Sequence, residues 1–286
     1  MIRLYTDTSA NLPLAVLKKY DIAVLPFSYT VNGEQAAYDA NTAFDGKQFY
    51  NAMRAGADVR TSLVSVGRFT DTFAPILAAG DDVLYIGMSG GISGTANSAA
   101  IAALDLKERF PQRSIAAVDT FAASLGEGML VLQAAELLAQ GCGFEELVET
   151  INMRKTVMCQ YFTVDDLMYL KKGGRIPAAV AIIGNLLGIK PLLMGDECGR
   201  IVMRSKTRGI ANALKAMAER YGTLCADKTA LIGIAHADNE AGAAQLLSLL
   251  RERGFTGECM TVFYEPVTGA HVGPGTVALF FPGTEK

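Results

Sequence analysis

Tryptophan is absent from the sequence, and only two of its 286 residues are histidines, His236 and His271. Two imidazole rings are too few for a histidine-rich metal centre. The five cysteines are scattered along the chain, and no two of them have the CxxC spacing typical of zinc sites and redox motifs. An odd number of dispersed cysteines indicates reduced thiols and argues against a disulfide framework. Because CxxC spacing is missing and only two histidines are present, we also expect no bound metal.

Long runs of one residue class are also missing. The formal net charge is −3, and no basic run is interleaved with aromatic residues, which argues against nucleic-acid binding. The N-terminal segment lacks the apolar run of a signal peptide. The most apolar stretch, residues 177–194, contains interrupting glycines, an asparagine, a lysine and a proline, and so falls short of the roughly 18 to 20 apolar residues of a membrane span. We therefore expect a cytoplasmic protein without a membrane span, and leave transient membrane contact open.

The sequence does contain a regular alternation of apolar runs and helical patterns. Hydrophobic residues make up 50% and charged residues 19%, a composition typical of a compact globular protein. In the first half, the alternation predicts a parallel sheet covered by helices on both faces, with a polar, turn-rich segment at residues 32–65. The expected strands are residues 1–6, 22–31, 82–88 and 114–120, and the expected helices are residues 12–20, 66–80, 93–110 and 126–141.

The second half mixes helices with strands that form hairpins, which favours an α+β arrangement with a mixed sheet. The fold class is therefore α/β, with an N-terminal α/β domain (residues 1–155) and a C-terminal α+β domain (residues 156–286). Strands are expected at residues 158–164, 230–236, 258–266 and 275–281, with a hairpin over residues 189–206. Helices are expected at residues 165–174, 179–188, 207–222 and 239–254.

Three loops at the carboxyl ends of the expected parallel strands are rich in hydroxyls, aspartate and glycine, at residues 6–11, 89–95 and 119–124. Ligands of a doubly wound sheet bind in this crevice, where helix N-termini suit a carboxylate or a phosphate. Ser93 is placed to cap the following helix, and Gly94 would let a ligand approach the backbone. The alternative is that each polar residue only caps its own helix.

Other candidate binding residues are hydroxyl, imidazole and guanidinium groups. Thr61 and Ser62 precede a predicted helix, either as ligand-binding groups or as a plain cap. His271 is in a turn framed by three glycines, a constrained setting that favours a functional role. Arg175, beyond a helix stop, and Arg208 are each either solvated or available to bind an anion.

Residues 87–91 match the Gly-x-Ser-x-Gly pattern of a serine hydrolase, with Ser89 as the nucleophile. His271 and either Asp227 or Asp238 would complete a triad. A nucleophile elbow runs straight into its helix, however, whereas this helix is expected to begin about four residues later. An esterase-like hydrolase is therefore kept as the alternative function.

Seven short motifs occur in the order found in one protein family. They are TDTSANLP, TS at Thr61 and Ser62, GISGT, VDTFAASLGEG, FTVDDLMYLKKGGRI, GIKPLL and GAHVGPG. Together they span nearly the whole chain, which on this basis resembles the DegV family. The resemblance implies two α/β domains with a long-chain fatty acid between them, its carboxyl bound by hydroxyls of the N-terminal domain and its tail in an apolar tunnel.

The resemblance also implies roles for individual residues and a partner. Arg208 matches the family arginine implicated in phosphoryl transfer, and Arg175 would line the rim of the site or contact the partner. That partner is a separate ATP-dependent fatty acid kinase, which forms the acyl phosphate for bacterial phospholipid synthesis. The residues that would bind or adjoin the carboxyl are Thr61, Ser62, Ser93, Gly94 and His271.

Elementary energetics agree with an acyl ligand. Hydrogen bonds of about 0.5–3 kcal/mol each would barely hold a small acid. A tail of about 14 methylenes adds roughly 11 kcal/mol, at about 0.8 kcal/mol for each buried CH₂. Residues 179–194 are apolar enough to line a tunnel or, alternatively, to form a core helix. No Walker-type loop is present, so we expect that the chain does not bind ATP or phosphorylate a ligand by itself. Together with the DegV resemblance, this implies a lipid-binding carrier that needs no cofactor and is not an enzyme by itself.

Overall fold

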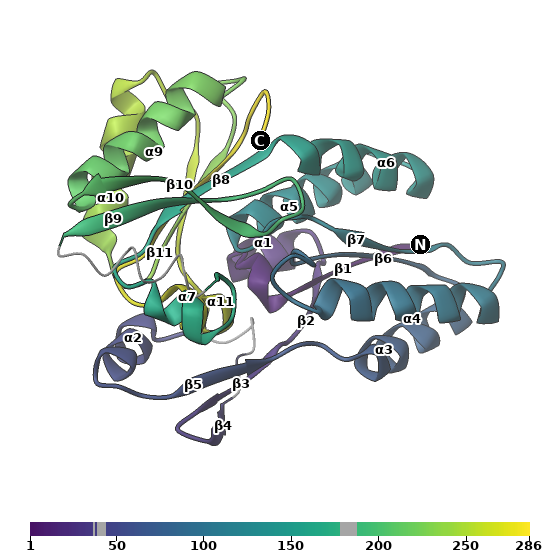
Figure 1. Cartoon of the computed structure of the whole chain (residues 1–286). Coiled ribbons are helices and arrows are strands. Elements are labelled where there is room, and N and C mark those ends of the chain that lie inside the picture. Colours follow the sequence, from purple (N-terminus) through teal and green to yellow (C-terminus); the bar gives the residue numbers. More distant parts are fainter. Residues whose placement is uncertain (37, 39–43, 178–187) are drawn as a thin grey trace.

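Four parallel strands form the sheet at the centre of the first half of the chain (Figure 1). The structure is a computed structural model that describes residues 1–36, 38, 44–177 and 188–286. The strands lie in the order β2-β1-β6-β7, and every neighbouring pair is parallel. Their bounds are Ile2–Asp7 for β1, Ala23–Leu25 for β2, Asp82–Gly87 for β6 and Ile115–Asp119 for β7. The predicted parallel sheet is confirmed.

Helices cover both faces of this sheet, as the alternating pattern predicts. Helices α3 and α4 pack together on one face, and α5 and α6 pack together on the other (Figure 1). The helix bounds are Leu14–Lys19 for α1, Val66–Ala78 for α3, Thr95–Arg109 for α4, Leu125–Ala139 for α5 and Phe144–Arg154 for α6. Two short 3₁₀ helices are η1 (Thr8–Ala10) and η2 (Lys155–Val157).

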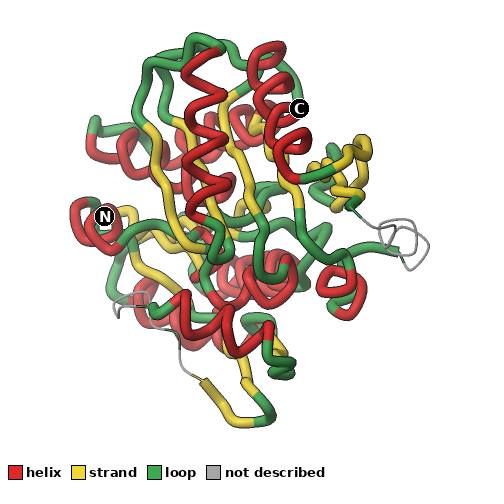
Figure 2. The backbone as a smooth tube through the Cα atoms, turned by 90° about the vertical axis from the view of Figure 1, so that its left-hand side faces the viewer, coloured by secondary structure: helices red, strands yellow, loops and turns green. Residues whose placement is uncertain are grey.

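The second half contains the predicted mixed sheet, in the order β10-β9-β8-β13-β11-β12. Only β11 and β12 are parallel, because α10 carries the chain between them. Helices α9 and α10 lie side by side over one face of the sheet (Figure 2). The strand bounds are Met158–Thr163 for β8, Ile189–Gly195 for β9, Ile201–Arg208 for β10, Ile232–His236 for β11, Cys259–Phe263 for β12 and Val277–Pro282 for β13. The helix bounds are Met168–Lys172 for α7, Ile210–Leu224 for α9, Glu240–Glu252 for α10 and Pro266–Val272 for α11.

A small antiparallel sheet, in the order β4-β3-β5, was not predicted from the sequence. The single strand expected at residues 22–31 is divided, because Pro26 lies between β2 and β3 and cannot donate to a sheet. The segment expected to be turn-rich, residues 32–65, contains α2, which Asp45 caps by accepting a hydrogen bond from the Gln48 amide at 2.9 Å. The bounds are Ser28–Val31 for β3, Glu34–Ala36 for β4, Val59–Ser62 for β5 and Gly46–Arg54 for α2.

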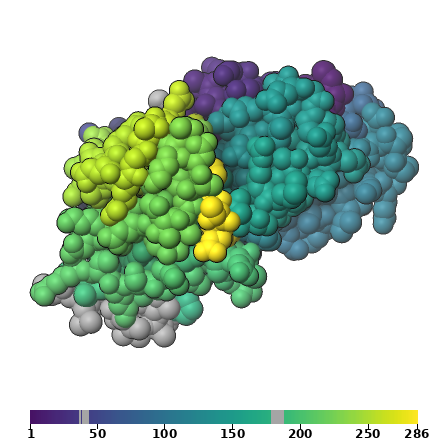
Figure 3. Space-filling model, turned by 90° about the horizontal axis from the view of Figure 1, so that it is seen from above, coloured from purple at the N-terminus to yellow at the C-terminus, as the bar shows by residue number. Residues whose placement is uncertain are grey.

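The two large sheets share one apolar core. In the space-filling view the two halves lie side by side, with the C-terminal residues at the seam between them (Figure 3). The core includes Leu84 of β6 and Phe280 of β13. The predicted domain boundary at residues 155 and 156 falls within η2, between the last helix of the first half and β8. The helix expected at residues 179–188 lies almost entirely outside the described residues.

Helix α5 lies between the two large sheets and contacts strands of both. Ten of its 15 residues are buried, including Glu127 and Gly128, so it lacks the polar face of an ordinary surface helix. It also packs against η1, which follows β1 directly. A helix packed on several sides fixes the loops around it, and these loops adjoin the site described below.

Replacing Gly128 with alanine is expected to lower the free energy of unfolding by about 2–3 kcal/mol. The added methyl group would overlap the backbone carbonyl of Ala10, which cannot turn away as a flexible side chain would. The matched control is Gly67→Ala in α3, where nothing lies within 4 Å of the added methyl group. Chemical denaturation would measure both variants, and equal stabilities would contradict this close packing of α5 on η1.

Candidate ligand site

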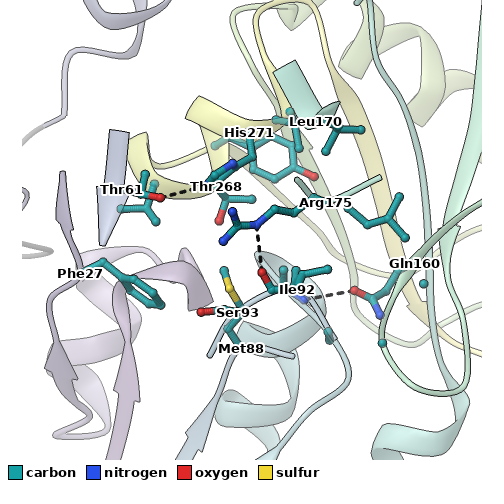
Figure 4. Close-up of a pocket in the computed structure, with 18 of the residues that line it drawn as sticks. Phe27, Thr61, Met88, Ile92, Ser93, Gln160, Leu170, Arg175, Thr268 and His271 are labelled. Atoms are coloured by element: carbon teal, nitrogen blue, oxygen red, sulfur yellow. Dashed lines mark hydrogen bonds between the residues drawn. The ribbon is translucent and has the colours of Figure 1, made fainter. Parts of the chain in front are cut away.

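A cavity lies between the two halves of the chain, walled by β5, the loop before α4, β8, α7 and α11 (Figure 4). The volume that the centre of a water-sized sphere can occupy in this cavity is about 220 Å³. Most of the wall is apolar, which suits a hydrocarbon ligand. Its apolar side chains include Phe27, Leu63, Met88, Phe162, Leu170 and Phe280.

Polar groups from segments far apart in the sequence meet in this cavity. All five residues predicted to surround a carboxyl group line it, and so does Arg175 (Figure 4). They come from β5, from the turn before α4, from α11 and from the segment after α7. The structure therefore brings together Thr61, Ser62, Ser93, Gly94, Arg175 and His271.

His271 lies on helix α11, and the prediction of a glycine-framed turn at this position is wrong. Pro266 occupies the first turn of the helix, where its missing N–H is tolerated. The buried Glu265 carboxylate caps the helix by accepting hydrogen bonds from the amides of Val267 and Thr268, both at 2.6 Å. The sequence EPVT, an acidic cap residue followed by proline, is a helix-start signal that the sequence analysis did not use.

The His271 ring is held beside β5 and is neutral at pH 7. Its Nε2 atom and the Thr61 hydroxyl oxygen are hydrogen-bonded at 2.9 Å. Burial, together with the smaller effect of the nearby Arg175 guanidinium, lowers the pKa of His271 to about 4. A neutral imidazole has one donor and one acceptor nitrogen, so it can hydrogen-bond Thr61 and still offer its second nitrogen to other groups.

Ser93 does not cap α4, contrary to the prediction. Gly94 is the N-cap residue and provides no side-chain cap, while the Ser93 hydroxyl accepts from the Thr95 amide at 3.3 Å and donates to the Thr95 hydroxyl at 3.1 Å. Ser93 is thus displaced by one residue from the cap position toward the cavity. Because Ser93 and Gly94 both line the cavity, the positive end of the α4 dipole lies at its wall.

Arg175 is a half-buried cation without a carboxylate partner in the described part of the chain. Its Nε–H donates to the Ile92 carbonyl at 2.9 Å, and its Nη1 donates to the Gly173 carbonyl. Burial lowers the pKa of the guanidinium, and no acidic group offsets this. The interpretation of Arg175 as a solvated residue after a helix cap is therefore wrong, because its charge faces a largely apolar cavity.

Two polar residues of the cavity were missed by the sequence analysis. Thr268, one turn from His271 on the same helix, has a buried hydroxyl that finds no hydrogen-bond partner among the described residues. The oxygen and the nitrogen of the Gln160 side-chain amide are both hydrogen-bonded. The oxygen accepts from the Ala123 amide at 3.2 Å, and the nitrogen donates to the Phe121 carbonyl at 2.9 Å. Gln160 therefore supports the loop at residues 119–124, while the Thr268 hydroxyl, near the Glu265 carboxylate, makes no well-formed hydrogen bond in the described part of the chain.

The serine-hydrolase triad is not assembled. Ser89 is fully buried, donates to the Gly199 carbonyl at 2.9 Å and accepts from the Gly91 amide at 3.0 Å. It does not line the cavity that contains His271. Asp238 pairs with Arg54, and the Asp227 carboxylate accepts from the Thr229 amide and hydroxyl.

Arg208 ends β10 as an exposed residue and does not line the cavity, so the structure does not bring it together with the other predicted residues. None of the described helices has both the length and the apolar composition needed to cross a membrane. In the described residues, no three His, Cys, Asp or Glu side chains are grouped so that they could hold a metal ion.

The loop at residues 6–11 forms a buried acid network behind the cavity. The Ser9 hydroxyl lies 2.5 Å from Asp7 Oδ1 and 2.6 Å from Glu127 Oε2. One hydroxyl hydrogen cannot serve both oxygens, so one carboxyl group must itself be protonated. Burial raises the pKa of both carboxyl groups, which agrees with this count. The network accepts from the Met88 amide at 3.3 Å and so supports the cavity wall.

Comparisons with known proteins agree with this architecture. A family model described as "Uncharacterised protein, DegV family" matches residues 1–283. The chain belongs to the DegV family. A DegV domain-containing protein of Clostridium perfringens is 35% identical over 99% of this chain and 98% of its own length.

Two solved DegV structures are also similar over nearly the whole chain. A DegV family protein from Thermus thermophilus, described by its fatty acid binding, is 30% identical with a TM-score of 0.85, and 98% of each chain is covered. A fatty acid binding DegV family protein from Streptococcus agalactiae is 32% identical with a TM-score of 0.85, again over 98% of each chain. The two-part α/β architecture predicted from the motifs is therefore that of the DegV family.

Proposed function

We propose that this DegV protein binds a long-chain fatty acid in the cavity between its two halves. The carboxylate would be hydrogen-bonded by hydroxyls of Thr61, Ser62 and Ser93 and by the Gly94 amide, with His271 beside it. The observation that carries the proposal is the Arg175 cation, which faces an apolar cavity without a counter-ion in the described residues. An amphipathic anion supplies both the missing charge and the apolar surface. The solved relatives described as fatty acid binding support this choice.

In this proposal, the two ends of the ligand contribute differently to binding. Hydrogen bonds and the Arg175 charge would fix the head group, while most affinity would come from the tail, at about 0.8 kcal/mol for each buried CH₂. Thr268 adds a buried hydroxyl without a partner in the described part of the chain, which a carboxylate oxygen would satisfy. The tail would follow the apolar side chains between β8 and α11.

The protein would act as a carrier that presents its fatty acid to a separate ATP-dependent fatty acid kinase in the cytoplasm, for acyl-phosphate formation and phospholipid synthesis. The bound carboxylate is the group that would accept the phosphoryl group. Arg208 is exposed outside the cavity. Any contribution of Arg208 to phosphoryl transfer would therefore be made at the interface with the kinase.

Mass spectrometry of solvent extracts from the purified protein tests the ligand directly. We expect a stoichiometric fatty acid of about 14 to 18 carbons, since the tail must supply most of the affinity. The extract of a heat-denatured, washed sample serves as the background. An extract without fatty acid, together with no binding when palmitate is added, would overturn the proposal.

Replacing Ser93 with alanine is expected to weaken palmitate binding about 10-fold or more, because one hydrogen bond to a charged group is lost. Ser89→Ala is the matched control, since Ser89 is buried outside the cavity, and we expect a smaller effect on affinity. Titration calorimetry on lipid-free protein would measure both. Hydrolysis of a p-nitrophenyl ester that disappears in Ser89→Ala would instead favour an esterase.

A further inference from the structure

A second cavity adjoins the first one at the head-group residues. Thr61, Arg175 and His271 line both cavities, so they form the partition between them. We call the second one the outer cavity and the first one the inner cavity. The volume that the centre of a water-sized sphere can occupy in the outer cavity is about 470 Å³. The outer walls are formed by β5 and the turn before it, by the C-terminal end of α7, and by α11.

The outer cavity differs from the inner one in chemistry. Its charged lining residues are Asp58, Arg60, Lys172 and Arg175, which give an excess of positive charge. Asp58 is already paired with Arg60, whose Nε lies 2.8 Å from Asp58 Oδ2. The exposed Lys172 ammonium makes no hydrogen bond or ion pair within the described ranges of the chain. Lys172 and Arg175 are therefore available for an anion on this side of the partition.

The backbone brings α7 close to the partition. A Cβ atom at Gly173 would overlap the His271 ring, so the absence of a side chain there allows the end of α7 to approach the imidazole. Lys172 precedes this glycine, and Arg175 follows it by two residues. One short segment thus places a cation on the outer wall and a second cation in the partition itself.

We propose that the outer cavity is a phosphoryl-binding site, which holds the phosphate of an acyl phosphate while the inner cavity holds the acyl chain. This inference rests on the proposed function. A phosphoryl group attached to the carboxyl oxygen lies beyond the carboxyl on the side away from the tail. With the tail in the inner cavity and the carboxyl at the partition, the phosphoryl group enters the outer cavity, where Lys172 and Arg175 bind its oxygens.

The test uses the lipid-free full chain and two ligands, palmitate and (2-oxoheptadecyl)phosphonate, a stable mimic of palmitoyl phosphate in which CH₂ replaces the bridging oxygen. We expect Lys172→Met to weaken phosphonate binding by about 5- to 10-fold and to leave palmitate binding unchanged. Lys171→Met is the matched control, because Lys171 lines neither cavity, and it should change neither affinity. The loss in Lys172→Met should shrink in high salt, since the contact is exposed.

The outcomes separate this inference from the proposed function. Palmitate binding to the wild-type chain, together with phosphonate binding that is the same in Lys172→Met, would overturn the phosphoryl site alone. Failure of both ligands to bind the wild-type chain would overturn the phosphoryl site and the proposed function together. Phosphonate binding that depends on Lys172 supports the site whatever the affinity for palmitate.

Discussion

Replacing Arg175 with methionine is expected to weaken palmitate binding by about 10- to 100-fold, the largest loss for any single head-group residue. The methionine side chain keeps the apolar contacts of the arginine stem but removes the charge that faces the cavity. The carboxylate would then be desolvated without a counter-ion. Titration calorimetry on lipid-free protein would measure the loss.

The same variant should hardly change the stability of the lipid-free protein. Its half-buried charge is already disfavoured, as the lowered pKa shows, so its removal offsets the lost hydrogen bonds to the Ile92 and Gly173 carbonyls. We expect the free energy of unfolding to change by less than about 1 kcal/mol. Arg154→Met, at an exposed arginine outside the cavity, is the control for losing one positive charge. Wild-type affinity in Arg175→Met would show that the head group does not lie beside this residue.

The large elements of the fold could be predicted because each buries a periodic apolar pattern. The parallel strands are short apolar runs, and α3, α4, α9 and α10 carry helical patterns of ordinary length. The small sheet was missed because β4 has only three residues and β5 has four, and each contains a single apolar residue among polar ones. These strands exist because they pair with β3, a long-range interaction that leaves little trace in local sequence.

The residues that line the cavity were easier to predict than the local structure that positions them. Thr61, Ser93 and His271 do line one cavity, but His271 is held by a helix and Ser93 lies one residue before the cap. Thr268 and Gln160 gave no signal, because a single threonine or glutamine becomes part of a site only through packing. These roles are set by tertiary contacts that local patterns do not encode.

The polar loop at residues 6–11 was expected to contact a ligand, but its side chains form a buried hydrogen-bond network. Residues 6–11 lie at the expected sheet edge, yet Asp7 and Ser9 turn inward to Glu127 on α5. The pairing joins residues 118 positions apart, so no local pattern could reveal it. A loop that was expected to contact a ligand instead supports the wall through the Met88 amide.

The stability of the lipid-free protein is expected to depend on the charge state of His271. The pKa of this residue is about 4 in the folded chain and about 6.5 when unfolded. Between these values the unfolded chain binds more protons, so the His271 contribution to stability is complete above about pH 6.5 and is lost as the pH falls through 4. The difference corresponds to about 3 kcal/mol, because protonation would place a charge in a buried site and, to a smaller extent, because that charge would lie beside the Arg175 guanidinium.

The absolute curve of stability against pH cannot isolate this effect, because the buried carboxyls of Asp7, Glu127 and Glu265 act in the opposite direction. Their pKa values are raised, that of Glu265 to about 7, so their contributions fall as the pH rises. The measurement is therefore the difference in unfolding free energy between wild type and His271→Gln, whose amide can still hydrogen-bond Thr61. We expect this difference to rise by about 3 kcal/mol in favour of wild type from pH 4 to pH 7. A difference that stays constant over this range would show that His271 titrates normally and is not shielded from water in the folded chain.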